Sequence, residues 1–212
     1  MIKLSLKSLA DYITANHARQ RKILRDCKYP DTDEASAKIW YYREARDAVT
    51  GFHRGGHEQQ WLLDRADNLR VLTQSTTGPV KKRLQHNARA IQQYATNCSD
   101  RVCTVEHELR LHIDFGHVRI TARPDLHITE RSKTRVIKLE FGVDAPAPDE
   151  IKIISQGLYE AAKGVLPAIT NRSVIYLDVP RSLEHFGARA GSRTLREMEA
   201  ACQNIEAVWP TL

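Results

Sequence analysis

A change of hydrophobic period near residue 97 constrains the fold of this chain more than any other feature of its sequence. Before that point apolar residues recur every three or four positions, as at Leu84 and Ala88, and this spacing predicts amphipathic helices. After it, apolar and polar residues alternate from Val105 to Ile113, which predicts a half-buried strand. The chain therefore divides into a helical part followed by a part that contains a sheet.

The remaining signals place individual elements in these two parts. Helices are expected from Leu4 to about residue 28, from about Asp31 to Gly55, over 57–72 and from Pro79 onward. The second part predicts a hairpin turning at Asp114–His117, strands at Val136–Phe141 and Val174–Val179, and helices at about 149–164 and 192–208. A strand, helix, strand order requires a crossover connection. We expect a mixed α/β fold, with a basic helical lobe at 1–97 and an α/β core at 98–212 forming one structural unit.

The net charge of +6 is unevenly distributed along the chain. Residues 1–100 hold 17 of the Lys and Arg residues against 11 Asp and Glu, whereas residues 101–212 hold 15 of each. A lopsided basic chain is typical of proteins that bind polyanions, and the alternative is a solvated basic face. We expect a nucleic acid, DNA in the first place, as the partner of this chain. A protein partner or a second copy of the chain is also possible from the sequence. The predicted phosphate contacts are Arg19, Arg21, Lys22, Arg25, Lys28, Lys81, Lys82 and Arg83.

Composition also bears on the compartment. No apolar run reaches the length of a membrane span, and Lys3 and Lys7 interrupt the start of the chain where a signal peptide would have its apolar core. The four cysteines, Cys27, Cys98, Cys103 and Cys202, show no paired spacing. We expect reduced thiols in a cytoplasmic protein without a membrane partner.

Charged residues on a strand with an apolar opposite face indicate a site. Lys138 and Glu140 are two residues apart, so both point from the same face of their strand. Asp125 follows Pro124, which marks an irregular stretch where the sheet opens. Together with Glu106, these carboxylates could hold a hard divalent cation, Mg or Mn, while Lys138 stabilises developing charge. The alternative is a cross-strand salt bridge.

The stretch from Glu106 to Tyr159 resembles the RecB-like branch of the PD-(D/E)XK nuclease superfamily. The matching parts are Glu106, then Val118 to Asp125, then Val136 to Gly142, and then Gln156-Gly-Leu-Tyr159. The resemblance implies a restriction-endonuclease-like core that hydrolyses phosphodiesters with Mg or Mn. It also implies metal ligands at Asp125, Glu140 and Glu106, with Lys138, Gln156 and Tyr159 completing the catalytic set.

The chain departs from the family pattern at two places. The acid and the lysine are exchanged, giving Lys138-x-Glu140, and Gln156 and Tyr159 are three residues apart instead of four. One interpretation is a nuclease with a rearranged site. The other is a catalytically degenerate nuclease-fold protein that binds DNA or acts as a scaffold, and a third is an interaction protein without nucleic acid. The family's iron–sulfur version needs three cysteines near the C-terminus, so no such cluster is expected.

Overall fold

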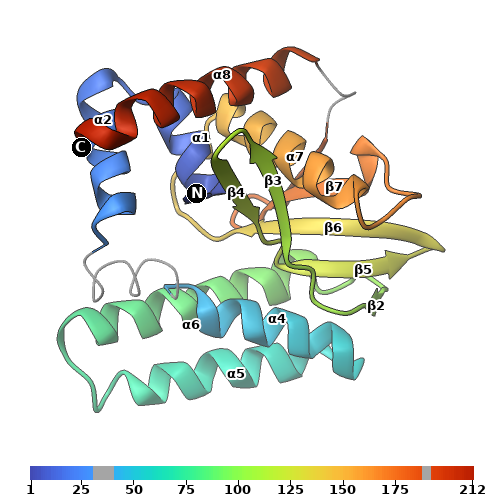
Figure 1. The fold of residues 1–212 in the computed structure, drawn as a ribbon. Coiled ribbons are helices and arrows are strands. Elements are labelled where there is room, and N and C mark those ends of the chain that lie inside the picture. The colour runs from blue at the N-terminus through green and yellow to red at the C-terminus, as the bar shows by residue number, and fades with distance from the viewer. Residues whose placement is uncertain (31–40, 188–191) are drawn as a thin grey trace.

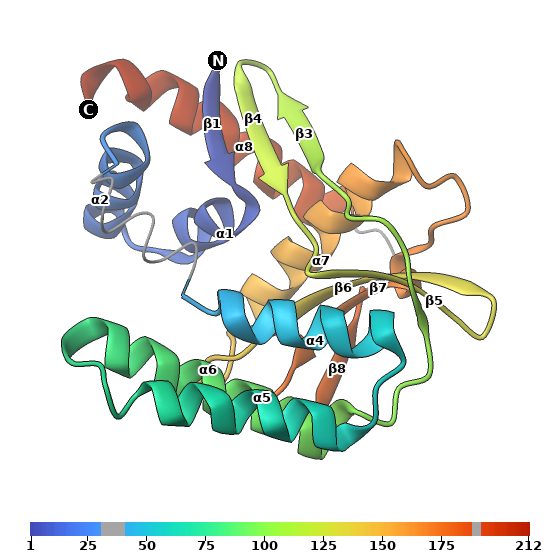
Figure 2. The same cartoon turned by 90° about the horizontal axis from the view of Figure 1, so that it is seen from below.

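A five-stranded mixed sheet forms the centre of the structure, and helices cover both of its faces (Figures 1 and 2). The computed structural model describes residues 1–30, 41–187 and 192–212. The strand order of the central sheet is β2, β5, β6, β7, β8. Its strands are β2 (Thr104–Val105), β5 (Leu126–Glu130), β6 (Lys133–Glu140), β7 (Val174–Asp178) and β8 (Leu183–Phe186). The expected mixed α/β class is confirmed.

Local sequence explains how the central strands connect. β5 and β6 are antiparallel and meet at Arg131 and Ser132, whose φ angles of 48° and 62° form a tight turn with positive φ at both central residues. β6 and β7 are parallel, and helix α7 (Pro148–Lys163) connects them. The predicted crossover is therefore present, because parallel neighbours cannot be joined by a short hairpin.

A second, three-stranded sheet was only partly predicted. β3 (Leu111–Phe115) and β4 (Val118–Ala122) form the expected hairpin, and β1 (Ile2–Ser5) pairs with β4 in parallel. The prediction of a helix from Leu4 is wrong, because the first residues gain backbone partners on β4, which lies far away in sequence. Helix α1 begins only at Leu6, after the Ser5 hydroxyl caps the Ser8 amide at 3.0 Å.

The helices otherwise lie near their predicted positions. The predicted first helix divides at Ala15 and Asn16, where the Asn16 side chain accepts a hydrogen bond from the Arg19 amide and begins a new helix. The part of the second predicted helix from Asp31 to residue 40 lies outside the described residues. The helices are α1 (Leu6–Thr14), α2 (His17–Lys28), α4 (Arg43–Gly55), α5 (Gln59–Leu72), α6 (Gly78–Cys98), α7 and α8 (Ser192–Val208), with short 3-10 turns at Asn171–Ser173 (η1) and Trp209–Thr211 (η2).

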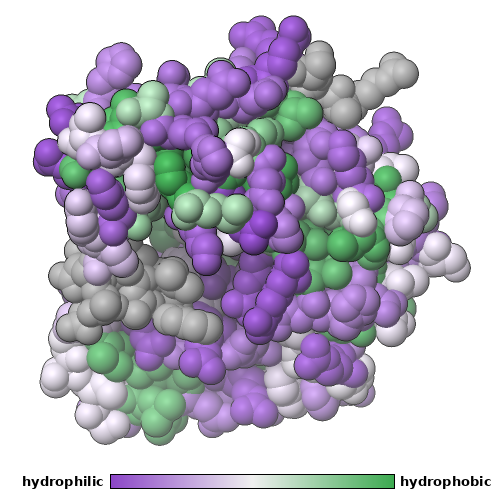
Figure 3. Space-filling model, in the orientation of Figure 1, coloured by the Kyte–Doolittle hydropathy of each residue, from purple (hydrophilic) through white to green (hydrophobic). Residues whose placement is uncertain are grey.

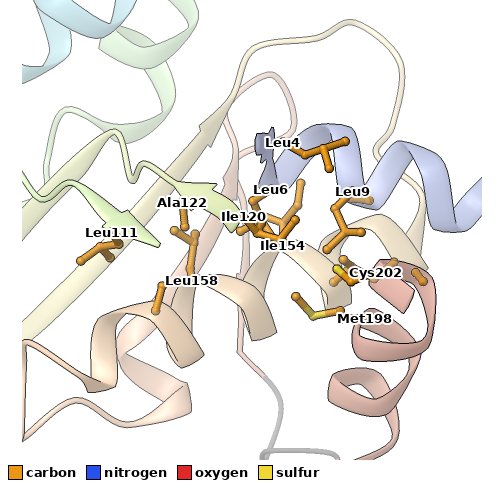
Figure 4. Close-up of a cluster of buried hydrophobic side chains, with 14 of the residues drawn as sticks. Leu4, Leu6, Leu9, Leu111, Ile120, Ala122, Ile154, Leu158, Met198 and Cys202 are labelled. Atoms are coloured by element: carbon orange, nitrogen blue, oxygen red, sulfur yellow. The ribbon is translucent and has the colours of Figure 1, made fainter. Parts of the chain in front are cut away.

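Two hydrophobic cores lie on opposite faces of the central sheet. The first core joins α1, α2, α7, α8 and the small sheet to Val136 and Tyr176 of the central sheet, and Figure 4 shows part of it. The second core joins α4, α5 and α6 to Ile137 and Leu139. Successive residues of β6 therefore point into different cores. The first 97 residues contribute to both cores, with α1 and α2 on one side of the sheet and α4 to α6 on the other.

No helix in the described part of the chain is long and apolar enough to cross a membrane.

Candidate functional site

Asp125 lies where the chain passes from the small sheet to the central sheet. β4 ends at Ala122 and β5 begins at Leu126, so Pro124 and Asp125 belong to the link between them. The interpretation of Pro124 as the point where the sheet opens is confirmed. The Asp125 amide donates to the Ile137 carbonyl at 2.9 Å, which keeps the residue beside β6 although it belongs to no strand.

Two cations and one amide bind the Asp125 carboxylate. Lys138 Nζ lies 2.8 Å from Oδ2, and the Leu139 amide donates to the same oxygen at 2.8 Å. Arg46 Nε of α4 lies 2.9 Å from the other oxygen, Oδ1. The Asp125 side chain is only 6% exposed. Both carboxylate oxygens are therefore engaged, and the three side chains together carry a net charge of +1.

Glu140 lies on the same strand but makes separate contacts. Its Oε1 accepts from the Gly142 amide at 2.7 Å, and its Oε2 accepts from the Tyr176 hydroxyl at 3.0 Å. Burial, and then the nearby Glu140 carboxylate, raise the pKa of Tyr176 well above its usual range. Tyr176 is therefore a protonated donor at neutral pH.

Glu106 is not part of this arrangement. It follows β2, where its amide donates to the His127 carbonyl at 2.8 Å and its Oε1 accepts from the Thr129 hydroxyl at 2.7 Å. Within residues 1–30, 41–187 and 192–212, no three His, Cys, Asp or Glu side chains lie close enough together to hold a metal ion.

These side chains do not fit the Mg or Mn ion that the family resemblance implies. Such an ion requires free carboxylate oxygens together with water or substrate oxygens. At Asp125 each oxygen already faces a cation, and an additional positive ion there would be repelled by both Arg46 and Lys138. The arrangement can hold the link and β6 together. Like the alternative that the sequence left open it is a salt bridge, but it joins β6 to a buried residue of the link instead of joining two strands.

The two residues expected from α7 make contacts of their own. Gln156 is buried, and its Nε2 donates to Glu160 Oε1 at 2.9 Å. Tyr159 packs against the first core, with Lys163 Nζ 5.9 Å from the centre of its ring. In the described part of the chain, no hydrogen bond joins either residue to Asp125, Lys138 or Glu140.

The basic residues of α2 form the most open cationic surface among the predicted sites. The helix buries Leu24 and packs Ile23 and Cys27 against the first core. On its outer side four cations are exposed, accompanied by the single carboxylate of Asp26, and the surface over α2 at the upper left of Figure 3 is mainly hydrophilic. We name these four residues the α2 basic face: Arg19, Arg21, Lys22 and Arg25.

The other predicted phosphate contacts are less available. Lys28 Nζ donates to the Trp209 carbonyl at 2.8 Å, which ties α2 to the C-terminal turn. Arg83 Nη1 lies 2.6 Å from Glu44 Oε1. Lys82 is exposed and Lys81 partly exposed. Near them, three apolar side chains are exposed beside the turn between α5 and α6, namely Val71, Leu72 and Val80. An apolar patch is also seen at the lower left of Figure 3.

Arg46 and Tyr176 are the site residues that sequence reasoning missed. Tyr176 could have been found, since its strand was predicted and it lies opposite Lys138 in the register of β6 and β7. Arg46 carries no such signal, because its contact with Asp125 depends on how α4 packs against the sheet.

Comparison of the chain with family models, with curated proteins and with solved structures finds no match.

Proposed function

We propose that this protein binds nucleic acid on a nuclease-like fold and does not hydrolyse it. The observation that carries the proposal is the engagement of both Asp125 oxygens by Arg46, Lys138 and the Leu139 amide. The lysine of the exchanged motif is in direct contact with the aspartate that the family resemblance makes a metal ligand. Of the interpretations that the sequence leaves open, this geometry favours the degenerate DNA-binding protein.

The electrostatic cost of a metal at Asp125 supports this choice. Two unit charges 4 Å apart interact by about 4 kcal/mol at an effective dielectric constant of 20. A divalent ion would meet about twice that repulsion from each neighbouring cation unless Lys138 and Arg46 moved away. Both side chains are partly buried, with exposed fractions of 24% and 31%, so moving them would also break their contacts with Asp125.

The α2 basic face supplies the binding surface of the proposal. Its cations are exposed, and no carboxylate in the described part of the chain forms a salt bridge with them. Each phosphate that such a residue neutralises releases counterions. Four contacts to duplex DNA give a slope of about −3 to −4 in a plot of log affinity against log salt concentration.

A cleavage assay tests the absence of hydrolysis. The wild-type protein and Asp125→Ala are incubated with single- and double-stranded DNA in Mg²⁺ or Mn²⁺. We expect no cleavage by either. Metal-dependent cleavage by the wild type that Asp125→Ala abolishes would overturn the proposal in favour of the rearranged nuclease.

A salt titration of binding tests the nucleic-acid partner. The test variant replaces all four residues of the α2 basic face with alanine, and its expected effect is a loss of most affinity together with the salt slope. A matched control replaces four exposed cations from other surfaces, Arg54, Arg110, Lys152 and Arg193. Binding that is absent, insensitive to salt, or reduced equally by the control would show that the α2 basic face is not a nucleic-acid-binding surface.

A further inference from the structure

An open groove lies at the turn between β5 and β6, and it was not among the sites expected from sequence. Its volume is about 740 Å³, within the range of about 300 to 1,000 Å³ found for ligand pockets. The turn, η1 and β8 line it, and its lining side chains include Lys133, Thr134, Arg135, Thr170, Arg172 and Phe186. In Figures 1 and 2 this turn and α2 lie at opposite sides of the molecule.

The groove is positively charged although the second half of the chain is electrically balanced. Among the described residues, its lining contains three cations, Lys133, Arg135 and Arg172, and no carboxylate. Arg135 is held in place, because its Nη1 donates to the Arg172 carbonyl at 2.6 Å and its Nε lies 3.7 Å from Glu130 Oε2. Lys133 and Arg172 are exposed, and in the described residues neither forms a salt bridge.

A neighbouring arginine pairs with two acids, one of which also contacts Arg135 of the groove. Arg101, whose side chain is only 9% exposed, pairs with Glu130 at 2.9 Å and also with Glu184. The carboxylates beside the groove are therefore already bound to a cation. An anion that enters the groove meets the lining cations and the hydroxyl groups of Thr134 and Thr170, and hydroxyls are good donors to phosphate oxygens.

Phe186 adds an apolar surface to this polar groove. It lies on β8, at the edge of the central sheet, and its side chain is 50% exposed. A half-exposed aromatic ring beside cations and hydroxyls is the combination that binds single-stranded nucleic acid, because a base stacks on the ring while the cations contact its phosphates. A duplex offers no free base face to such a ring.

We propose that this groove binds a short segment of single-stranded nucleic acid, with Phe186 stacking on a base and Lys133 and Arg172 contacting the phosphates. The inference goes beyond the proposed function, because it adds a second surface and assigns it a single strand. It does not require the α2 basic face to bind. Arg135 holds β6 and η1 together at the groove, because it contacts the Arg172 carbonyl as well as Glu130.

Fluorescence anisotropy on the full chain tests the inference, with a labelled single-stranded oligothymidine and a duplex of equal length as probes. Phe186→Ala removes the stacking surface, and Leu183→Ala is its control, since Leu183 lies on the same strand and is 49% exposed. We expect Phe186→Ala to weaken single-strand binding about tenfold and to leave duplex binding unchanged. Leu183→Ala changes neither.

The charge contribution is tested with the double variant Lys133→Ala, Arg172→Ala. Two lost phosphate contacts lower the salt slope for a single strand by about 1.4. The matched control, Lys152→Ala with Arg193→Ala, keeps the slope. Circular dichroism and urea unfolding establish that each variant is folded.

The outcomes separate this inference from the proposed function. Loss of single-strand binding in the groove variants supports the inference, even where the variant of the α2 basic face has no effect. Equal effects of Phe186→Ala and Leu183→Ala overturn it. Equal losses of duplex and single-strand binding, or displacement of the oligonucleotide by an equal concentration of inorganic phosphate, also overturn it, because they assign the groove to phosphate alone.

Discussion

Replacing Asp125 with asparagine tests whether the ion-paired aspartate stabilises the fold. Asparagine keeps the shape of the side chain and can still accept from the Leu139 amide, but it removes the negative charge. Arg46 and Lys138 then face each other without the carboxylate that separates them. We expect a large loss of stability from a change of one charge.

The contacts set the size of this loss. A hydrogen bond to a charged group contributes about 1.5 to 3 kcal/mol, and breaking a buried ion pair costs about 3 to 5 kcal/mol. The aspartate is 6% exposed, whereas Lys138 and Arg46 are 24% and 31% exposed, so water compensates part of what they lose. The free energy of unfolding should therefore fall by about 2 to 4 kcal/mol.

Urea unfolding measures this change. For a denaturant slope of about 2 kcal/mol per molar urea, the midpoint should fall by about 1 to 2 M. Asp149→Asn is the matched control, because Asp149 also pairs with a lysine, Lys152, but its side chain is 74% exposed. Its effect should stay below about 0.5 kcal/mol.

Two results would refute the reasoning. A loss for Asp125→Asn no larger than that of the control would show that the buried ion pair does not contribute to stability. An increase in the stability of the wild type on adding Mn²⁺, absent from Asp125→Asn, would show that a metal replaces Arg46 and Lys138 at the aspartate.

Two further predictions concern the helices on either side of the sheet. A Cβ at Gly157 of α7 would lie 2.4 Å from Leu6 Cδ1 in the first core. In a thermal unfolding assay, Gly157→Val should therefore lower stability by about 1 to 3 kcal/mol through overpacking. Gly164→Ala, whose Cβ meets nothing closer than 3.9 Å, should be nearly neutral in that assay. Burial lowers the pKa of His53 from 6.5 to about 4, and its Nε2 lies 2.7 Å from the Tyr94 hydroxyl. The unfolded chain binds the proton more readily, so stability is fully present above about pH 6.5 and falls by about 3 kcal/mol toward pH 4. This decrease should be smaller in His53→Gln, and equal pH profiles would contradict the assignment.

The sequence was sufficient for the parts of the site that depend on local pattern. The period of two along β6 placed Lys138 and Glu140 on one face, and Pro124 marked the link that holds Asp125. The same periodicity could not show that Val136, on that face, is buried in the first core. Nor could it show which side chains the acids contact. Glu106 accepts a hydrogen bond from Thr129 and Glu140 accepts one from Tyr176, and both contacts depend on how neighbouring strands are paired.

Contacts between distant segments account for what the sequence did not predict. The apolar spacing of the first residues suits a helix, and only pairing with β4 makes Ile2–Ser5 a strand. β8 depends likewise on β7, beside which it lies antiparallel. In both cases the strand forms because it pairs with a backbone segment from another part of the chain. Local β propensity does not predict such a partner.

Arg46 changes how the exchanged motif is interpreted. If Lys138 were the only cation at Asp125, exchanging the residues at 138 and 140 would be enough to free the carboxylate. Arg46 would still hold Oδ1 at 2.9 Å, and it comes from α4, a helix of the second core that covers the opposite face of the sheet from α7. Two cations from separate elements therefore neutralise one aspartate. The first half of the chain, which holds the charge excess, therefore supplies both the exposed cations of α2 and the arginine that pairs with Asp125.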